Sequence, residues 1–191
     1  MKIQPYIDEL QSISSMSGYS LGKARMLAII EKIEAKTRTV EDCELFYWLG
    51  IAYRNYCSWY IRGDERKTFL EKAVAYLKKS YDCATRIPYK SHDPFNWFDR
   101  VSIISDLCDI LVNERLVRNY DYAEPLLSDL LARSDDYEPA MCSYIQLLYA
   151  EKRYTDALVA AQKTQAFIDT STECNNVPCV QKLIEKIYRK I

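Results

Sequence analysis

Apolar residues recur at spacings of three and four along this chain, and this helical period constrains the fold more than any other feature of the sequence. In the segment 69–84, the apolar side chains fall on one side of a helix, while Lys72, Lys78 and Lys79 point elsewhere. No convincing stretch alternates apolar and polar residues as a half-buried strand does. The sequence therefore predicts an all-α protein.

Boundary residues divide the periodic segments into antiparallel helix pairs. Gly63 and Pro88 mark helix ends, and Asp or Asn residues that precede proline mark helix starts. The pairs are expected at about residues 3–36, 40–87, 94–133 and 137–170, followed by a last helix at about 177–191. A chain of 191 residues fits one domain or one short array, so residues 1–191 are interpreted as a single helical domain.

The last segment, residues 177–191, is strongly amphipathic. Its apolar face consists of Val180, Leu183, Ile184, Ile187, Tyr188 and Ile191, and its other face carries lysine, arginine and glutamate. A stacked array of helix pairs needs a polar-backed end to cover its last apolar face, which favours a capping helix. The alternative is a docking helix for a partner.

Composition and charge argue against several classes of protein. The chain has 26 Lys and Arg against 27 Asp and Glu, so its net charge of −1 does not attract it as a whole to nucleic acid or to an anionic membrane. It lacks the ~18–20 consecutive apolar residues of a membrane span, and Asp8 and Glu9 lie where a signal peptide would be apolar. Most of the seven cysteines lie in apolar helical patterns, as free thiols do in a reducing compartment. A cytoplasmic location is expected.

Residue patterns typical of catalysis or of metal binding are missing. The four glycines stand apart, so no glycine-rich loop is available to bind a phosphate. Cys174 and Cys179 lack the second ligand pair of a structural zinc site. Ser91, His92 and Asp93 are adjacent in sequence, whereas a catalytic triad must converge in space. We therefore expect no enzyme activity, no cofactor and no metal.

Small residues recur where paired helices would cross, because only small side chains let two helix backbones approach closely. These positions are expected at Ala24 with Ala28, at Ala73, at Ala123, and at Ala157 with Ala161. The step from Ala123 to Ala157 is 34 residues, whereas the two earlier steps are 49 and 50. Longer helices or longer connections are expected in the earlier units.

Two sets of residues match a known repeat pattern. Phe46, Leu49, Gly50 and Tyr53 fit its first helix, and Tyr154, Ala157, Ala161 and Thr164 fit its second helix. Over about residues 3–170 the chain thus resembles the tetratricopeptide repeat family, with Phe46 in place of Trp and Ala161 in place of a bulky residue. The resemblance implies an alpha solenoid, in which the helix pairs stack as a right-handed superhelix. A more globular, repeat-like helical bundle is the alternative.

In this family the first helices line a concave face that binds an extended or helical segment of another protein. The resemblance implies that Tyr47, Ile51, Arg54, Asn55, Cys142, Gln146 and Tyr149 face that groove. Arg54 and Asn55 would hold a carboxylate through charge-assisted hydrogen bonds, although Arg54 also fits an ordinary solvated position. The loop Pro88–Phe98, with His92 and Trp97, is a further candidate contact.

The resemblance therefore implies a protein-protein interaction module, an adaptor or scaffold that binds a peptide or helical segment of a partner. The alternative is a dedicated chaperone or immunity-type protein that wraps and neutralises one secreted or toxic partner. In both hypotheses the partner is another protein or peptide, with no nucleic acid and no membrane.

Overall fold

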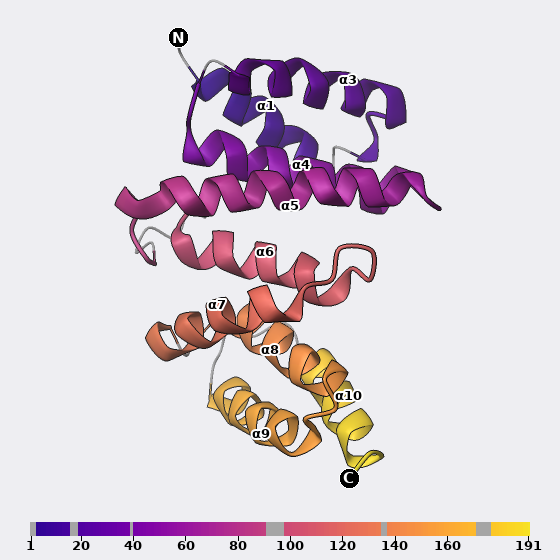
Figure 1. The fold of residues 1–191 in the computed structure, drawn as a ribbon, viewed down its shortest axis with the longest axis vertical. Helices are drawn as coiled ribbons and strands as arrows, with labels where there is room; N and C mark the ends of the chain where they lie inside the picture. Colours follow the sequence, from indigo (N-terminus) through magenta and orange to yellow (C-terminus); the bar gives the residue numbers. More distant parts are fainter. Residues whose placement is uncertain (1–2, 16–18, 39, 91–97, 135–136, 171–176) are drawn as a thin grey trace. The chain divides into compact units, whose positions relative to one another are not determined.

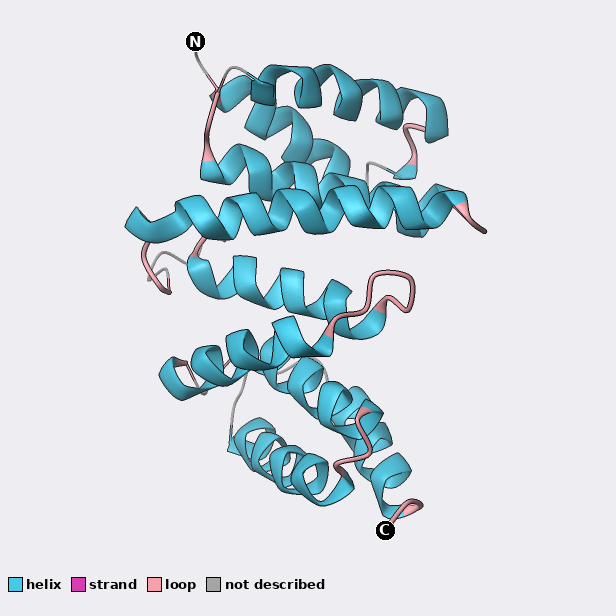
Figure 2. Cartoon of the chain, in the orientation of Figure 1, coloured by secondary structure: helices cyan, strands magenta, loops and turns pink. Residues whose placement is uncertain are grey.

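A computed structural model describes residues 3–15, 19–38, 40–90, 98–134, 137–170 and 177–191. Helices joined by short turns make up these residues, and no strand occurs among them (Figure 2). The prediction of an all-α chain is confirmed for this part of the protein. The stacking of the helices as a right-handed superhelix stays a prediction.

The helices follow the predicted order (Figure 1). They are α1 (Gln4–Ser14), α3 (Lys23–Glu34), α4 (Cys43–Tyr60), α5 (Glu65–Cys83), α6 (Arg100–Asn113), α7 (Tyr120–Arg133), α8 (Glu138–Ala150), α9 (Tyr154–Thr170) and α10 (Val177–Tyr188), with short 3-10 turns at Ala35–Arg38 and Ala84–Arg86.

Side-chain caps position three of the helix starts. Asp42, Asp99 and Asn119 each accept a hydrogen bond from the backbone N–H three residues later, at 2.8, 2.7 and 3.1 Å. Such a bond satisfies one of the N–H groups that the first turn of a helix leaves unpaired. Helix α6 accordingly begins after Asp99, and α7 begins after Asn119 rather than at Asp121. The start predicted near residue 94 lies outside the described residues.

Contacts group the chain into two compact units, Met1–Leu107 and Cys108–Ile191. In the first unit, α4 and α5 lie side by side along their lengths, and α1 and α3 pack against α4 (Figure 1). Their shared core is rich in large side chains, and Leu49, Tyr53, Tyr56 and Leu77 are fully buried.

Gly50 sets the distance between α4 and α5. A Cβ atom added at Gly50 would lie 2.7 Å from Cγ of Leu77 and 3.2 Å from the carbonyl oxygen of Ala73. Ala73 is itself fully buried. The two helices thus approach each other where both side chains are small, as predicted at Ala73.

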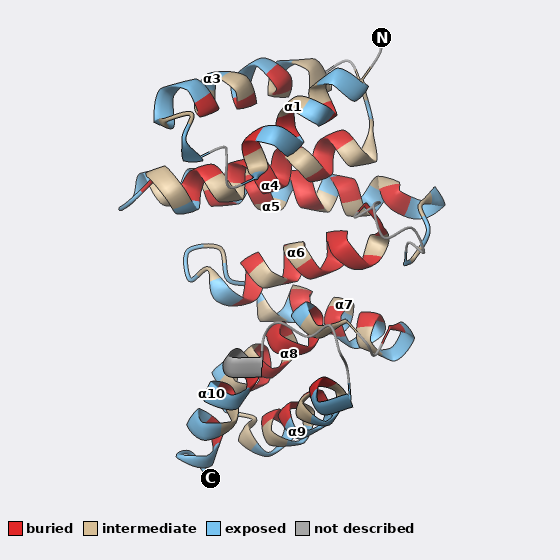
Figure 3. Cartoon of the chain, turned by 180° about the vertical axis from the view of Figure 1, so that it is seen from behind, coloured by how far each residue is buried: buried red, intermediate tan, exposed pale blue. Residues whose placement is uncertain are grey.

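In the second unit, α8 packs against α7 and α9, and α10 packs against α9 and α8. Much of α8 is coloured as buried in Figure 3. Ala123, Ala157, Ala161 and Thr164 are also buried. A close helix crossing at the alanines stays a prediction.

The predicted small-residue crossing in α3 is wrong. Ala24 and Ala28 are exposed, and the buried side of α3 is formed by Met26, Ile30 and Ile33. Alanine tolerates both a helix crossing and a solvated helix face, so small size alone does not indicate which side of a helix is buried. Here the larger side chains determine the buried side.

The turn between α8 and α9 contains a residue in the left-handed region. Lys152 has φ of 65°. Its N–H donates to the carbonyl of Tyr149 at 3.1 Å, and the N–H of Arg153 donates to the carbonyl of Leu148 at 2.9 Å. This pairing is the Schellman motif, which usually has glycine at the position of Lys152. Arg153 then bonds Glu124, which ties the turn to α7.

Substitution of Gly50 by Ala should destabilise the first unit by about 1–3 kcal/mol, because the added methyl group overpacks against Leu77. At an open helical position the same change would stabilise by up to about 1 kcal/mol. Chemical denaturation measures the difference. Leu77→Ala removes the clashing atoms, so the double variant should lose less stability than the two single losses added together. If the stability losses of the two single variants add up in the double variant, the close contact between Gly50 and Leu77 is contradicted.

Substitution of Lys152 by Gly should stabilise the protein by about 0.5–1 kcal/mol, because glycine adopts a positive φ without the steric cost that a Cβ atom imposes. The side chain of Lys152 is exposed, so its removal costs little packing. Thermal unfolding measures the effect. Lys163→Gly, at an exposed position inside α9, is the matched control and should destabilise.

Candidate functional site

Two of the predicted groove residues on α4 bind a carboxylate of the same chain. The hydroxyl of Tyr47 donates to Oδ2 of Asp106 at 2.7 Å, and Nη1 of Arg54 donates to Oδ1 at 3.1 Å. Tyr47 and Arg54 are seven residues apart, two helical turns, and therefore lie on the same face of α4. Asp106 lies in the part of α6 that belongs to the first unit, so these bonds hold that part against α4.

The other two predicted residues on α4 also contact the chain itself. Ile51 is 8% exposed, and Nδ2 of Asn55 donates to the carbonyl of Ser14 at 2.8 Å. Because Ser14 is the last residue of α1, this bond satisfies a carbonyl that the helix end leaves unpaired. All four α4 side chains are therefore engaged inside the first unit. A direct contact of these residues with a partner stays a prediction.

The predicted residues on α8 lie in two environments. Cys142 is buried in an apolar cluster with Ile168 of α9 and Val180 of α10. Gln146 and Tyr149 are half-buried and line a hollow of about 340 Å³ together with three residues of α10. We call this the α8–α10 hollow, which consists of Gln146, Tyr149, Lys182, Leu183 and Lys186.

The two sides of the α8–α10 hollow differ in character. Lys182 and Lys186 are exposed, and neither makes a hydrogen bond or an ion pair with any other residue that the structure describes. Leu183, between them in sequence, is 7% exposed and provides an apolar surface. On α8, the ring of Tyr149 packs against the ring of Tyr154 with 5.5 Å between centroids, which restrains its orientation. The hollow therefore combines positive charge with neutral hydrogen-bonding groups.

Sequence reasoning missed the lysines of this hollow. They were assigned to the polar face of the capping helix, whereas they lie at the edge of its apolar stripe, next to Leu183. The signal was their spacing of four residues, which puts Lys182 and Lys186 on one edge of α10. The sequence spacing does not indicate which helix that edge faces, because the neighbour depends on how α10 packs against α8.

A second hollow, of about 370 Å³, lies elsewhere on the second unit and is more apolar. Leu131 of α7, Met141 and Leu148 of α8, and Val159 of α9 contribute to it. The side chain of Val159 is 63% exposed. Among the described residues that line it, no buried side-chain nitrogen or oxygen lacks a hydrogen-bond partner.

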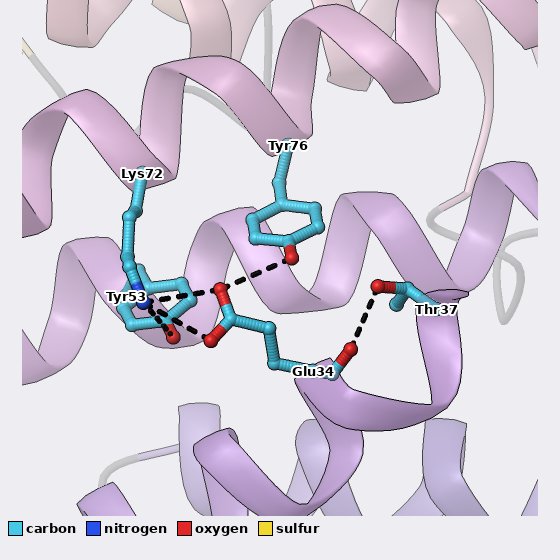
Figure 4. Close-up of polar contacts among 5 residues, drawn as sticks. All are labelled: Glu34, Thr37, Tyr53, Lys72 and Tyr76. Carbon is cyan, nitrogen blue, oxygen red and sulfur yellow. Dashed lines mark hydrogen bonds and ion pairs between the residues drawn. The ribbon is translucent and has the colours of Figure 1, made fainter.

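A polar cluster joins α3 to α4 and α5 in the first unit (Figure 4). Nζ of Lys72 donates to both carboxylate oxygens of Glu34, at 3.1 and 3.0 Å, and to the hydroxyl of Tyr53 at 3.1 Å. The hydroxyl of Tyr76 donates to Oε1 of Glu34 at 3.1 Å. Lys72 Nζ also lies 4.9 Å from the centroid of the Tyr53 ring, a cation–π contact.

The cluster shifts the pKa of both acidic groups. Burial alone would raise the pKa of Glu34, but hydrogen bonds from Lys72, Tyr53 and Tyr76 and the charge of Lys72 outweigh it and hold that pKa below its ordinary value. Burial, and then the neighbouring Glu34 carboxylate, raise the pKa of Tyr53. Glu34 is thus ionised and Tyr53 neutral at pH 7, and the cluster acts as a structural tie between α3 and the α4–α5 pair.

In the predicted contact loop Pro88–Phe98, residues 91–97 lie outside the described residues, and so does Cys174. Within the described part of the chain, no three His, Cys, Asp or Glu side chains gather closely enough to hold a metal ion. Among the same residues, no helix combines the length and the apolar character needed to span a bilayer.

Comparisons with protein families, with curated proteins and with solved structures find no match to this chain.

Substitution of Glu34 by Gln should lower the free energy of unfolding by about 1–2 kcal/mol at pH 7, because it removes a charged acceptor from half-buried hydrogen bonds. The folded-state pKa of Glu34 is depressed, so its contribution is complete above its ordinary pKa of 4.5 and is lost as pH falls through the lower folded value. The difference between the two proteins should therefore shrink below about pH 4.5.

Urea denaturation at several pH values measures this difference. Glu31→Gln is the matched control, because it removes the same charge from an exposed position on the same helix. It should change stability by less than about 0.5 kcal/mol. A Glu34→Gln loss that stays constant down to pH 3 would contradict a stabilising role of the ionised carboxylate.

Proposed function

We propose that this chain is a protein-protein interaction module of the tetratricopeptide repeat type, and that its α8–α10 hollow binds an acidic segment of a partner protein. The observation that carries the proposal is the pairing of two exposed lysines on α10 with Gln146 and Tyr149 of α8 around one hollow. Gln146 and Tyr149 are also two of the residues that the family resemblance assigns to partner binding.

The spacing of the lysines suits an extended peptide. Four residues of an α-helix rise about 6 Å, which separates the attachment points of Lys182 and Lys186. Alternate residues of an extended peptide are about 6.6–6.8 Å apart and point the same way. Two acidic residues at alternate positions of a partner can therefore each face one lysine. Leu183, between the lysines, provides an apolar contact for a side chain of the partner.

The polar groups on α8 complement this charge. The amide of Gln146 offers both donors and an acceptor, as a peptide backbone requires, and the Tyr149 hydroxyl offers one of each. Charged groups attract the partner and neutral groups align its backbone, so both sides of the hollow have a role in recognition. Binding by such a surface weakens as salt increases, because exposed charges are screened.

A protein segment is favoured over nucleic acid as the occupant. Two lysines neutralise few phosphates, and the chain as a whole carries a net charge of −1. Proteins that bind nucleic acid through its backbone usually present a larger basic surface, because each neutralised phosphate adds to affinity.

The proposal predicts that reversing the charge of both lysines weakens binding of an acidic peptide. The probe is a fluorescein-labelled peptide with glutamates at alternate positions and leucines between them, measured by fluorescence anisotropy. Lys182→Glu with Lys186→Glu should raise its dissociation constant at least about tenfold, because two exposed ion pairs of ~0.2–1 kcal/mol each are lost and repulsion replaces them. Affinity of the unaltered protein should fall as salt increases from 50 to 300 mM.

The matched control reverses two lysines away from the hollow. Lys152→Glu with Lys163→Glu makes the same change in net charge on the same unit, at exposed positions. Binding should change less than threefold in this control. An equal loss in both variants would mean non-specific attraction, and a glutamine version of the peptide that binds as tightly would exclude acidic recognition. Either result would overturn the proposal.

A further inference from the structure

Two cysteine thiols meet where α4 begins and α5 ends. Cys43 is the first residue of α4, and Cys83 is the last residue of α5. The two helices pack side by side and are joined by a short turn, so the start of one lies near the end of the other (Figure 1). The thiol of Cys43 is close enough to that of Cys83 to raise its pKa.

Hydrogen bonds of Ser80 connect it to both cysteines, and the bond to Cys43 does not involve a sulfur atom. Oγ of Ser80 donates to the carbonyl of Cys43 at 2.8 Å, and Sγ of Cys83 donates to the carbonyl of Ser80 at 3.5 Å. Ser80 is fully buried, one turn before Cys83 on α5. It therefore fixes the end of α5 against the start of α4.

Accessibility separates this pair from other thiols of the chain. Cys43 and Cys83 are both partly exposed, whereas Cys57, Cys108 and Cys142 are buried. An oxidant in solution therefore reaches the pair more readily than it reaches those three. Two adjacent accessible thiols can be oxidised to a disulfide, whereas a single thiol stops at sulfenic acid or proceeds to higher oxides.

We propose that Cys43 and Cys83 form a redox pair that a peroxide converts into a disulfide between α4 and α5. One thiolate attacks the O–O bond of the peroxide, takes one oxygen as sulfenic acid and releases hydroxide. The second thiolate attacks the sulfenic sulfur, forms the S–S bond and expels a second hydroxide. Two thiols and one hydrogen peroxide thus give one disulfide and two waters, and a thiol reductant reverses the change.

The environment of the Cys83 thiol slows this oxidation. Burial, with contributions from the Cys43 contact and from the charge of Asp42, raises the pKa of the Cys83 thiol to about 12. Each thiol must act once as a nucleophile, whichever reacts first with the peroxide. Oxidation is therefore slow at neutral pH, and the pair responds to sustained rather than brief exposure to an oxidant.

Disulfide formation should be visible in the unaltered protein. The protein is incubated with hydrogen peroxide for several hours, alkylated, digested without reductant and analysed by mass spectrometry. A cross-linked peptide pair containing Cys43 and Cys83, two hydrogen masses lighter than the free thiols, is expected as the main disulfide. The cross-link closes a loop of about 40 residues, so the oxidised protein should melt at least about 5 °C higher than the reduced protein.

Variants identify the pair and remove competing thiols. Cys43→Ser and Cys83→Ser should each abolish both the cross-link and the rise in melting temperature, whereas Cys174→Ser with Cys179→Ser should keep both. The cross-link is measured in the unaltered chain, so the test does not depend on how well the single variants fold. Oxidation that leaves Cys43 and Cys83 unlinked, or that links either mainly to another cysteine, would overturn the proposal.

Discussion

The close approach of α4 and α5 at Gly50 is the contact on which the first unit depends. With no Cβ atom at Gly50, Leu77 and the backbone of Ala73 pack directly against α4. This packing aligns the side chains of both helices, so Tyr53 of α4 and Lys72 and Tyr76 of α5 meet the Glu34 carboxylate together. A wider separation would leave that half-buried carboxylate without several of its donors, and the cost of an unpaired buried charge is high.

Much of the fold could be predicted from the sequence, because helix formation depends on local patterns. The period of three and four located the helices, and the small residues Ala73, Ala123 and Ala157 correctly indicated buried helix faces. The predictions of buried positions failed where a residue type suits both a buried and an exposed environment. Alanine fits both a crossing and a solvated face, which is why Ala24 was misassigned. The start of α7 differs from the predicted one because Asn119 rather than Asp121 supplies the cap.

The candidate site was less predictable, because it depends on contacts between helices distant in sequence. The position of Arg54 on the inner face of α4 suggested that it binds a carboxylate, but nothing near it in sequence identified Asp106, 52 residues later, as an acceptor. Similarly, the pattern of α10 indicated an amphipathic helix, whereas its orientation on α8 determines that Lys182 and Lys186 border Gln146 and Tyr149. Periodicity describes one helix at a time and contains no information about its rotation against a neighbour.

Helix α10 has a buried apolar stripe and an exposed charged edge. Val180 and Ile187 are fully buried, while Lys182 and Lys186 at the edge of the same helix are exposed. Substitutions at the exposed edge leave the buried stripe intact, so the charge of the hollow can change during evolution without loss of the cover over α8 and α9. Related chains that recognise different partners would then differ at positions 182 and 186 while they retain apolar residues at 180 and 187.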